Sequence, residues 1–167
     1  TPDQIAFGKW PGDHPLPIQL IFHISKTAQP SAGSVLDRIG FSYPNVEQKL
    51  AELQAAGVKV VQAVTTTGLP WKHALVEDPW GARLELVEDP DLLGLHHVTL
   101  GVPDPPQMLS WLVRAFGGDR ATVMGLDVIR IRELGLFYVI AEENDHPTPS
   151  QGHVIDHIAW GPIDLDK

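Results

Sequence analysis

The sequence predicts an α+β protein built from tandem units, each ordered strand, helix, strand, strand, strand. A four-residue pattern occurs three times, as Leu-Asp-Arg-Ile at 36–39, Leu-His-His-Val at 95–98 and Ile-Asp-His-Ile at 155–158. The third positions, 38, 97 and 157, lie 59 and 60 residues apart, and a repeat of this length indicates stacked supersecondary units. The intervals between the copies also show the same succession of strand and helix patterns.

Residues 35–92 are predicted to form one complete unit. Apolar and polar residues alternate over 35–43, which indicates a strand. A helix is expected to begin at Asn45, with Gln48 at the capping-box position, and to end at Gly57. The remaining strands are predicted at 58–64, 71–76 and 82–87, with a turn at 77–81 before the last of them.

Residues 93–146 repeat this order. A strand at 95–102 is followed by a helix with Asp104 as its N-cap and Pro105 at its first position. Gly117 and Gly118 close the helix, and the last strands are predicted near 121–124, 127–132 and 135–141.

The two ends are expected to be incomplete units. Residues 1–34 resemble the last strands of a unit followed by a linker, and 147–167 resemble the start of another, with a strand at 153–161. Shifting the sequence by 119 residues places Pro-Ser-Ala-Gly at 30–33 on Pro-Ser-Gln-Gly at 149–152. The unit is therefore itself doubled, and we expect a parent protein with four units.

Composition limits the partners and the metal chemistry. The 167 residues carry a formal charge of -9, which argues against nucleic acid and anionic membrane surfaces. Cysteine is absent, so a metal would need His, Asp or Glu ligands, which suit Fe(II), Mn, Ni or Zn. The sequence contains no apolar stretch of membrane-spanning length and no signal-peptide pattern, and we expect a cytoplasmic protein.

The chain resembles the vicinal oxygen chelate superfamily, which includes glyoxalase I, bleomycin-resistance proteins and type I extradiol dioxygenases. The resemblance is carried by residues 95–104, by residues 155–158 and by the Glu-Asp-Pro-Trp-Gly turn that leads into Leu-Glu-Leu within 77–86. It implies curved, cup-shaped mixed sheets with the helices outside. It also implies a divalent metal in the cup that chelates two adjacent oxygens of a small-molecule substrate.

The resemblance also implies the metal ligands His97, His157 and Glu85. Two imidazoles and one carboxylate form the facial triad of non-haem iron enzymes, so Fe(II) or Mn(II) is the expected metal. The alternative is that each histidine is a half-buried strand residue and that Glu85 is an exposed one.

Two pairings of units are open. A cup formed by the two complete units would contain Arg38, Glu85, His97 and Tyr138. Because arginine stays protonated and cannot ligate a metal, such a cup is a doubtful metal site, and Arg38 would pair with Glu85 instead. A cup that joins 93–146 with the unit beginning at 147 would contain His97 and His157, with its carboxylate beyond Lys167.

Two more histidines need an interpretation. His73 lies on a predicted strand that can line a cup, and it is the candidate general acid or base. The alternative is a solvated strand residue. His96 precedes His97, so the alternation of a strand predicts that it points to the opposite face and serves packing or the surface.

The leading functional hypothesis is a metal-dependent enzyme like the extradiol dioxygenases, acting on a catechol-type molecule. One alternative is a glyoxalase-like lyase or isomerase with Zn or Ni, which wants a second carboxylate ligand that the sequence does not reveal. Another is a metal-free binding protein of the bleomycin-resistance type. The unpaired sheet edges of the incomplete units predict a homodimer.

Overall fold

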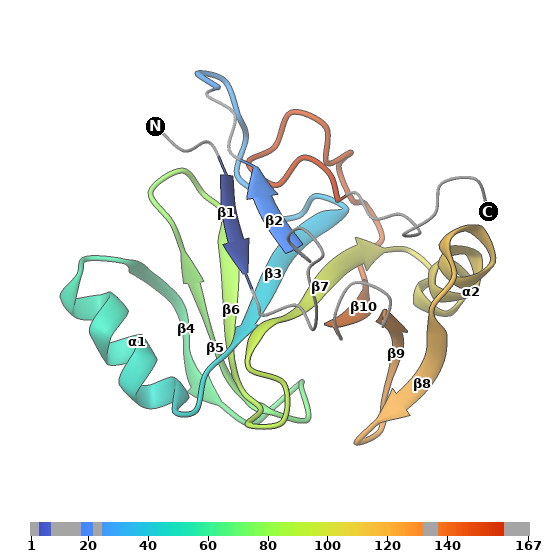
Figure 1. Ribbon diagram of the computed structural model, residues 1–167. Coiled ribbons are helices and arrows are strands. Elements are labelled where there is room, and N and C mark those ends of the chain that lie inside the picture. The colour runs from blue at the N-terminus through green and yellow to red at the C-terminus, as the bar shows by residue number, and fades with distance from the viewer. Residues whose placement is uncertain (1–3, 8–17, 22–24, 132–136, 159–167) are drawn as a thin grey trace.

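A computed structural model describes residues 4–7, 18–21, 25–131 and 137–158. Its helices and strands follow one another in the predicted order (Figure 1). They are β1 (Gln4–Phe7), β2 (Ile18–Ile21), β3 (Leu36–Ser42), α1 (Val46–Ala55), β4 (Lys59–Thr65), β5 (Lys72–Glu77), β6 (Arg83–Glu88), β7 (Gly94–Val102), α2 (Pro105–Phe116), β8 (Asp119–Val123), β9 (Leu126–Ile131) and β10 (Phe137–Glu143).

The two complete units join edge to edge in one curved sheet. This eight-stranded sheet has the order β4-β5-β6-β3-β7-β10-β9-β8, and β1 and β2 form a separate antiparallel pair. The first strands of the units, β3 and β7, are antiparallel neighbours at its centre. Each is flanked by the last strand of its own unit in parallel, β6 beside β3 and β10 beside β7. The predicted fold class, tandem βαβββ units in a curved mixed sheet, is confirmed.

The pairing of 93–146 with the final unit does not form in the described part of the chain. The strand expected over 153–161 is absent at 155–158, where the backbone is irregular, and 159–161 lie outside the described residues. The β-bridge of His153 to Gln29 is an isolated one, outside any strand.

Both helices begin where the sequence places them. The Asn45 side chain accepts a hydrogen bond from the backbone N–H of Gln48 at 2.8 Å, and Asp104 caps α2 through Gln107 in the same way at 2.9 Å. These bonds satisfy backbone donors that a helix N-terminus would otherwise leave free. No helix in the described ranges is long and apolar enough to cross a membrane.

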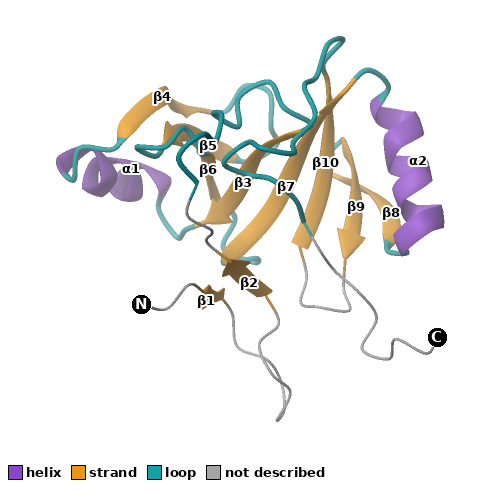
Figure 2. Cartoon of the chain, turned by 90° about the horizontal axis from the view of Figure 1, so that it is seen from above, coloured by secondary structure: helices purple, strands orange, loops and turns teal. Residues whose placement is uncertain are grey.

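The helices cover one face of the sheet and leave the other to form a cup (Figure 2). Helix α1 buries Val46 and Leu50 against the outward side chains of β5 and β6. Helix α2 packs Leu109 and Leu112 against β7, β9 and β10. The inner face carries a second apolar cluster, Leu69, Trp71, Val87, Val128, Tyr138 and Ile140.

The longer repeat has a structural counterpart in two linkers that lie side by side. The N–H of Gln29 donates to the carbonyl of Gly152 at 3.0 Å, and the N–H of Thr148 donates to that of Gly33 at 3.0 Å. A shift of 119 residues converts the first bond into the second, since 29 becomes 148 and 33 becomes 152. The two linkers therefore make equivalent backbone contacts with each other.

Candidate functional site

The inner face carries a buried polar cluster because both central strands bulge at the repeated motif. The β3–β7 register passes from Leu36 opposite Leu100 to Arg38 opposite Thr99, so Asp37 is an extra residue. It then passes from Gly40 opposite His97 to Phe41 opposite Leu95, which makes His96 extra. Consecutive side chains in a regular strand point to opposite faces, whereas a bulge re-aims one of them.

Contacts confirm that each bulge brings two consecutive side chains together. Arg38 Nη1 donates to Asp37 Oδ2 at 3.1 Å, and the Nδ1 atoms of His96 and His97 lie 2.8 Å apart. The prediction that His96 points to the opposite face from His97 is therefore wrong. The bulge could not be read from alternation, although it falls at the same place in both copies of the repeat.

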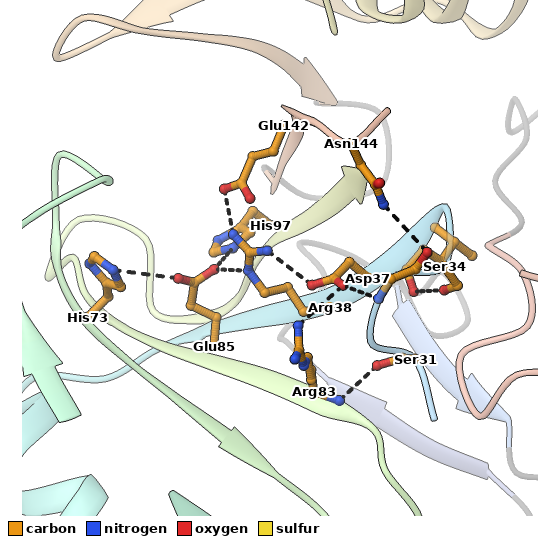
Figure 3. Close-up of polar contacts among 12 residues, drawn as sticks. Ser31, Ser34, Asp37, Arg38, His73, Arg83, Glu85, His97, Glu142 and Asn144 are labelled. Atoms are coloured by element: carbon orange, nitrogen blue, oxygen red, sulfur yellow. Dashed lines mark hydrogen bonds and ion pairs between the residues drawn. The ribbon is translucent and has the colours of Figure 1, made fainter. Parts of the chain in front are cut away.

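Arg38 lies at the centre of the cluster and joins carboxylates from both units (Figure 3). Its Nε donates to Glu85 Oε2 on β6 at 2.7 Å, and its Nη2 donates to Glu142 Oε1 on β10 at 2.5 Å. With the Asp37 bond, three carboxylates surround one guanidinium. The predicted pairing of Arg38 with Glu85 is thus present in the structure.

The charges of Arg38 and Glu85 stabilise each other. Burial alone would raise the pKa of the Glu85 carboxyl, but the His97 hydrogen bond and the charge of Arg38 lower it to about 2. Burial disfavours the Arg38 cation, yet Glu85 and Glu142 outweigh that cost and raise its pKa further. Both groups are therefore ionised across the physiological range.

His97 is fixed beneath this ion pair. Its ring is fully buried, and Nε2 lies 3.1 Å from Glu85 Oε2. Gly40, opposite it on β3, leaves the space for the ring, because a Cβ there would lie 2.1 Å from Cε1 of His97. The structure therefore brings together two of the predicted ligands, His97 and Glu85.

The residue that β10 contributes to the cup differs from the prediction. The sequence places Tyr138 there, and Tyr138 instead joins the apolar cluster, with its ring stacked on Trp71 at 5.8 Å between centroids. Glu142 reaches Arg38 from the same face of β10, four residues later. The signal for it was weak, because Glu142 precedes a polar break and resembles the end of an exposed strand.

His73 also belongs to the inner face. It is buried on β5, with Nδ1 2.9 Å from the carbonyl oxygen of Trp71 and Nε2 3.9 Å from Glu85 Oε1. The alternative of a solvated strand residue is therefore wrong. Its role as acid or base stays a prediction.

His157 lies away from this cluster. Its side chain is 72% exposed, and Nδ1 is 3.0 Å from Asp156 Oδ1. It borders an apolar cavity together with Val98 and Leu100, whose side chains point away from the face that carries His97. The structure therefore places His157 and His97 on opposite faces of the sheet, and they do not share a site.

The donor set around Arg38 does not fit a divalent metal. A metal at this point would need the oxygens of Glu85 and Glu142 that the guanidinium binds, and it would meet a permanent positive charge. In the described ranges no three His, Asp or Glu side chains are grouped so that they can hold a metal ion. The predicted ligand set of His97, His157 and Glu85 is not assembled there.

A small polar cavity of about 260 Å³ opens beside Arg38. Its lining includes Asp37 on β3, Arg83 on β6 and Thr99 on β7. It also includes Glu142 and Glu143 at the end of β10 and Asn144 just after it. The guanidiniums of Arg38 and Arg83 are therefore the cationic groups that a small molecule in this cavity would contact, beside the carboxylates of Asp37, Glu142 and Glu143.

No protein-family model matches the sequence, and no curated protein sequence matches it either. Solved structures do match in fold. A glyoxalase I mutant from Zea mays superposes with a TM-score of 0.61 at 16% identity, covering 78% of this chain and 50% of that one. Glyoxalase I from Zea mays gives 0.55 at 18% identity, covering 72% of this chain and 47% of that one.

The chain thus spans about half the length of these glyoxalase I structures. At this level of identity the likeness concerns the fold. It agrees with the motifs at 77–86 and 95–104 and with the paired units of the observed sheet. On these grounds the chain has the paired βαβββ fold of the vicinal oxygen chelate superfamily.

Proposed function

We propose that the cup formed by residues 35–146 binds a small molecule without a metal ion, and that Arg38 supplies the positive charge at its centre. The observation that carries this proposal is the position of the Arg38 guanidinium between Glu85 and Glu142, one carboxylate from each unit. The guanidinium already pairs with these two carboxylates, and it occupies the position between them that a divalent metal would take.

Arg38 retains binding capacity despite its ion pairs. Its guanidinium has five N–H donors, and the bonds to described carboxylates use three of them. One hydrogen remains on each of Nη1 and Nη2, a geometry that suits two neighbouring oxygen acceptors. The ligand class is therefore a small molecule with adjacent oxygens, the class that the resemblance to the vicinal oxygen chelate superfamily implies.

The extradiol-dioxygenase hypothesis has less support from this cup. It needs two histidines and a carboxylate around one iron, and His157 lies on the far face of the sheet from His97. A catechol is still a suitable ligand, because it presents adjacent oxygens, but ring cleavage needs a metal, and the described residues do not bring His97 and His157 together with a carboxylate.

A glyoxalase-like activity with Zn or Ni is the second candidate, and Glu142 favours it. This residue is the second carboxylate that such chemistry needs and that the sequence alone did not reveal. A metal site of Glu85, His97 and Glu142 would form only if Arg38 left both carboxylates.

The test is ligand binding in the presence of a chelator. A panel of catechols, 2-oxo acids and 2-hydroxy ketones would be screened by ligand-observed NMR against the whole chain. We expect at least one compound to bind to the chelated protein and to lose at least tenfold in affinity in Arg38→Met. Arg114→Met, on the exposed side of α2, is the matched control and should bind as the wild type does. Binding only after Zn(II) or Mn(II) is added, or no binding at all, would contradict the proposal.

A further inference from the structure

A row of polar side chains crosses three neighbouring strands and borders the small polar cavity. In the register of the sheet, Arg38 on β3 lies beside Arg83 on β6 and beside Thr99 on β7. All three residues line the cavity. Figure 3 shows both guanidiniums directed at the Asp37 carboxylate, with Nη1 of Arg38 at 3.1 Å and Nη1 of Arg83 at 3.5 Å from its oxygens. One side of the cavity therefore carries several hydrogen-bond donors.

Two polar atoms in this row are buried without a hydrogen-bond partner. They are Nε of Arg83 and Oγ1 of Thr99, and no group in the described ranges bonds to either atom. The Thr99 residue is only 1% exposed. An unpaired buried polar atom costs free energy, and most such atoms in proteins have a partner. The Thr99 hydroxyl, which can both donate and accept, is therefore free to bond to a molecule in the cavity.

Carboxylates outnumber guanidiniums around the cavity. Its described lining contains the two cations Arg38 and Arg83 and the three carboxylates Asp37, Glu142 and Glu143. A further negative charge in this space would be repelled by the excess of carboxylates. A ligand carboxylate would also offer no hydrogen for the lining carboxylates to accept. The lining therefore disfavours an acid as the ligand.

The lining also favours an aliphatic ligand over an aromatic one. None of its described members is aliphatic or aromatic, because the residues other than the charged ones and Thr99 are two glycines and one asparagine. Sites that enclose aromatic ligands are lined mostly by apolar side chains. Hydroxyl groups match a polar lining of both signs, because each hydroxyl can accept from a guanidinium and donate to a carboxylate at the same time.

We infer that the cavity selects neutral aliphatic molecules with adjacent oxygens, namely vicinal diols and 2-hydroxy ketones, over carboxylic acids and catechols. The inference rests on the proposed metal-free binding and narrows its ligand class. The ligand oxygens accept from the free N–H groups of Arg38 and from Thr99. The ligand hydroxyls donate to the carboxylates of Glu142 and Glu143.

The test compares probes that share a carbon skeleton and differ by one carboxylate. Glycerol is paired with glycerate, and dihydroxyacetone with hydroxypyruvate, while catechol is the aromatic probe. Binding to the chelated whole chain is measured by ligand-observed NMR at pH 7 and low salt. We expect each neutral probe to bind about tenfold more tightly than its acid, and more tightly than catechol. Added salt should narrow the gap between neutral probe and acid, because it screens the repulsion.

Two variants assign the selection to single residues. Glu143→Gln removes one charge from the lining and should reduce the preference for the neutral probes about threefold. Asp145→Asn, at an exposed carboxylate in the following loop, is the matched control and should leave the preference unchanged.

Thr99→Val keeps the approximate shape of the side chain and removes its hydroxyl. It should weaken binding of the neutral probes about threefold. The free energy of unfolding should not fall, because the hydroxyl has no partner within the described part of the chain.

The outcomes separate this inference from the proposed function. Equal or tighter binding of the acids or of catechol would overturn the inference and leave metal-free binding in place. Equal effects of Glu143→Gln and Asp145→Asn, or unchanged binding in Thr99→Val, would also overturn it. Binding of none of these probes to the chelated protein would contradict the proposed function, and the inference with it.

Discussion

At the scale of single residues, Gly40 determines whether His97 fits beneath the Arg38–Glu85 ion pair. A Cβ on Gly40 would lie 2.1–2.5 Å from three ring atoms of His97, and that ring is fully buried and held at Glu85. We expect Gly40→Ala to lower the free energy of unfolding by about 1–3 kcal/mol, the typical cost of overpacking a filled site.

Urea denaturation measures this loss, and Gly101→Ala is its control. A Cβ at Gly101 would meet the Asn144 side chain, its amide nitrogen at 3.2 Å and its Cβ at 3.3 Å, which is a much milder overlap than at Gly40. The control should lose clearly less. Equal losses in the two variants would show that the His97 ring is not held as described.

Stability should fall in acid because Glu85 must be protonated. Its pKa is lowered from 4.5 to about 2 in the folded protein, so its contribution is present above pH 4.5 and is lost as the pH falls towards 2. This difference corresponds to about 3 kcal/mol as an order of magnitude. Urea titrations at fixed pH values between 6 and 2 would follow the loss.

Glu85→Gln isolates this contribution. The amide cannot ionise, so the variant should be less stable at neutral pH, and its stability should depend less steeply on pH below 4.5. An unchanged slope would mean that Glu85 is not held ionised by Arg38 and His97.

Residue types in the sequence were enough to predict the Arg38–Glu85 pair, because arginine cannot ligate a metal and a carboxylate was expected nearby. They were not enough for His96 and Glu142. The contact of His96 depends on a bulge, and that of Glu142 on the reach of a strand end towards another unit. Both depend on neighbours distant in sequence.

At the scale of elements, the helices were predictable because their signals are local. Asp104 and Pro105 mark the start of α2, and the cap bond to Gln107 forms as expected. We expect Asp104→Ala to cost about 1 kcal/mol of unfolding free energy in urea denaturation, the typical value of a lost N-cap.

Asp145→Ala, in the loop after β10, provides the comparison for this cap. Its side chain is exposed, and its removal should change stability by no more than about 0.5 kcal/mol. If Asp104→Ala behaves like Asp145→Ala, the cap does not contribute to stability.

At the scale of the whole molecule, the repeat predicted the units but left their pairing open. Adjacent units pair through β3 and β7, which joins residues from 52 (Ser42 and Gly94) to 64 (Leu36 and Leu100) positions apart, and periodicity carries no information about such contacts. The same limit explains His157. Its motif matches that of Arg38 and His97, yet the structure places it on the other face of the sheet.

The homodimer stays a prediction. The strands β4 and β8 form the two edges of the main sheet, and such edges favour association with another chain. Light scattering of the purified chain at working concentration should give twice the mass of the 18.3 kDa chain. A mass equal to one chain would remove this prediction.

The central claim is that Arg38 takes the place of a divalent cation, and metal content tests it most directly. The wild type and Arg38→His would be loaded with Zn(II) or Mn(II), dialysed and measured by elemental analysis. The substitution removes the fixed charge and adds an imidazole beside Glu85, His97 and Glu142. We predict little metal in the wild type and a near-stoichiometric amount in the variant. Near-stoichiometric metal in the wild type, lost in His97→Ala, would contradict the account.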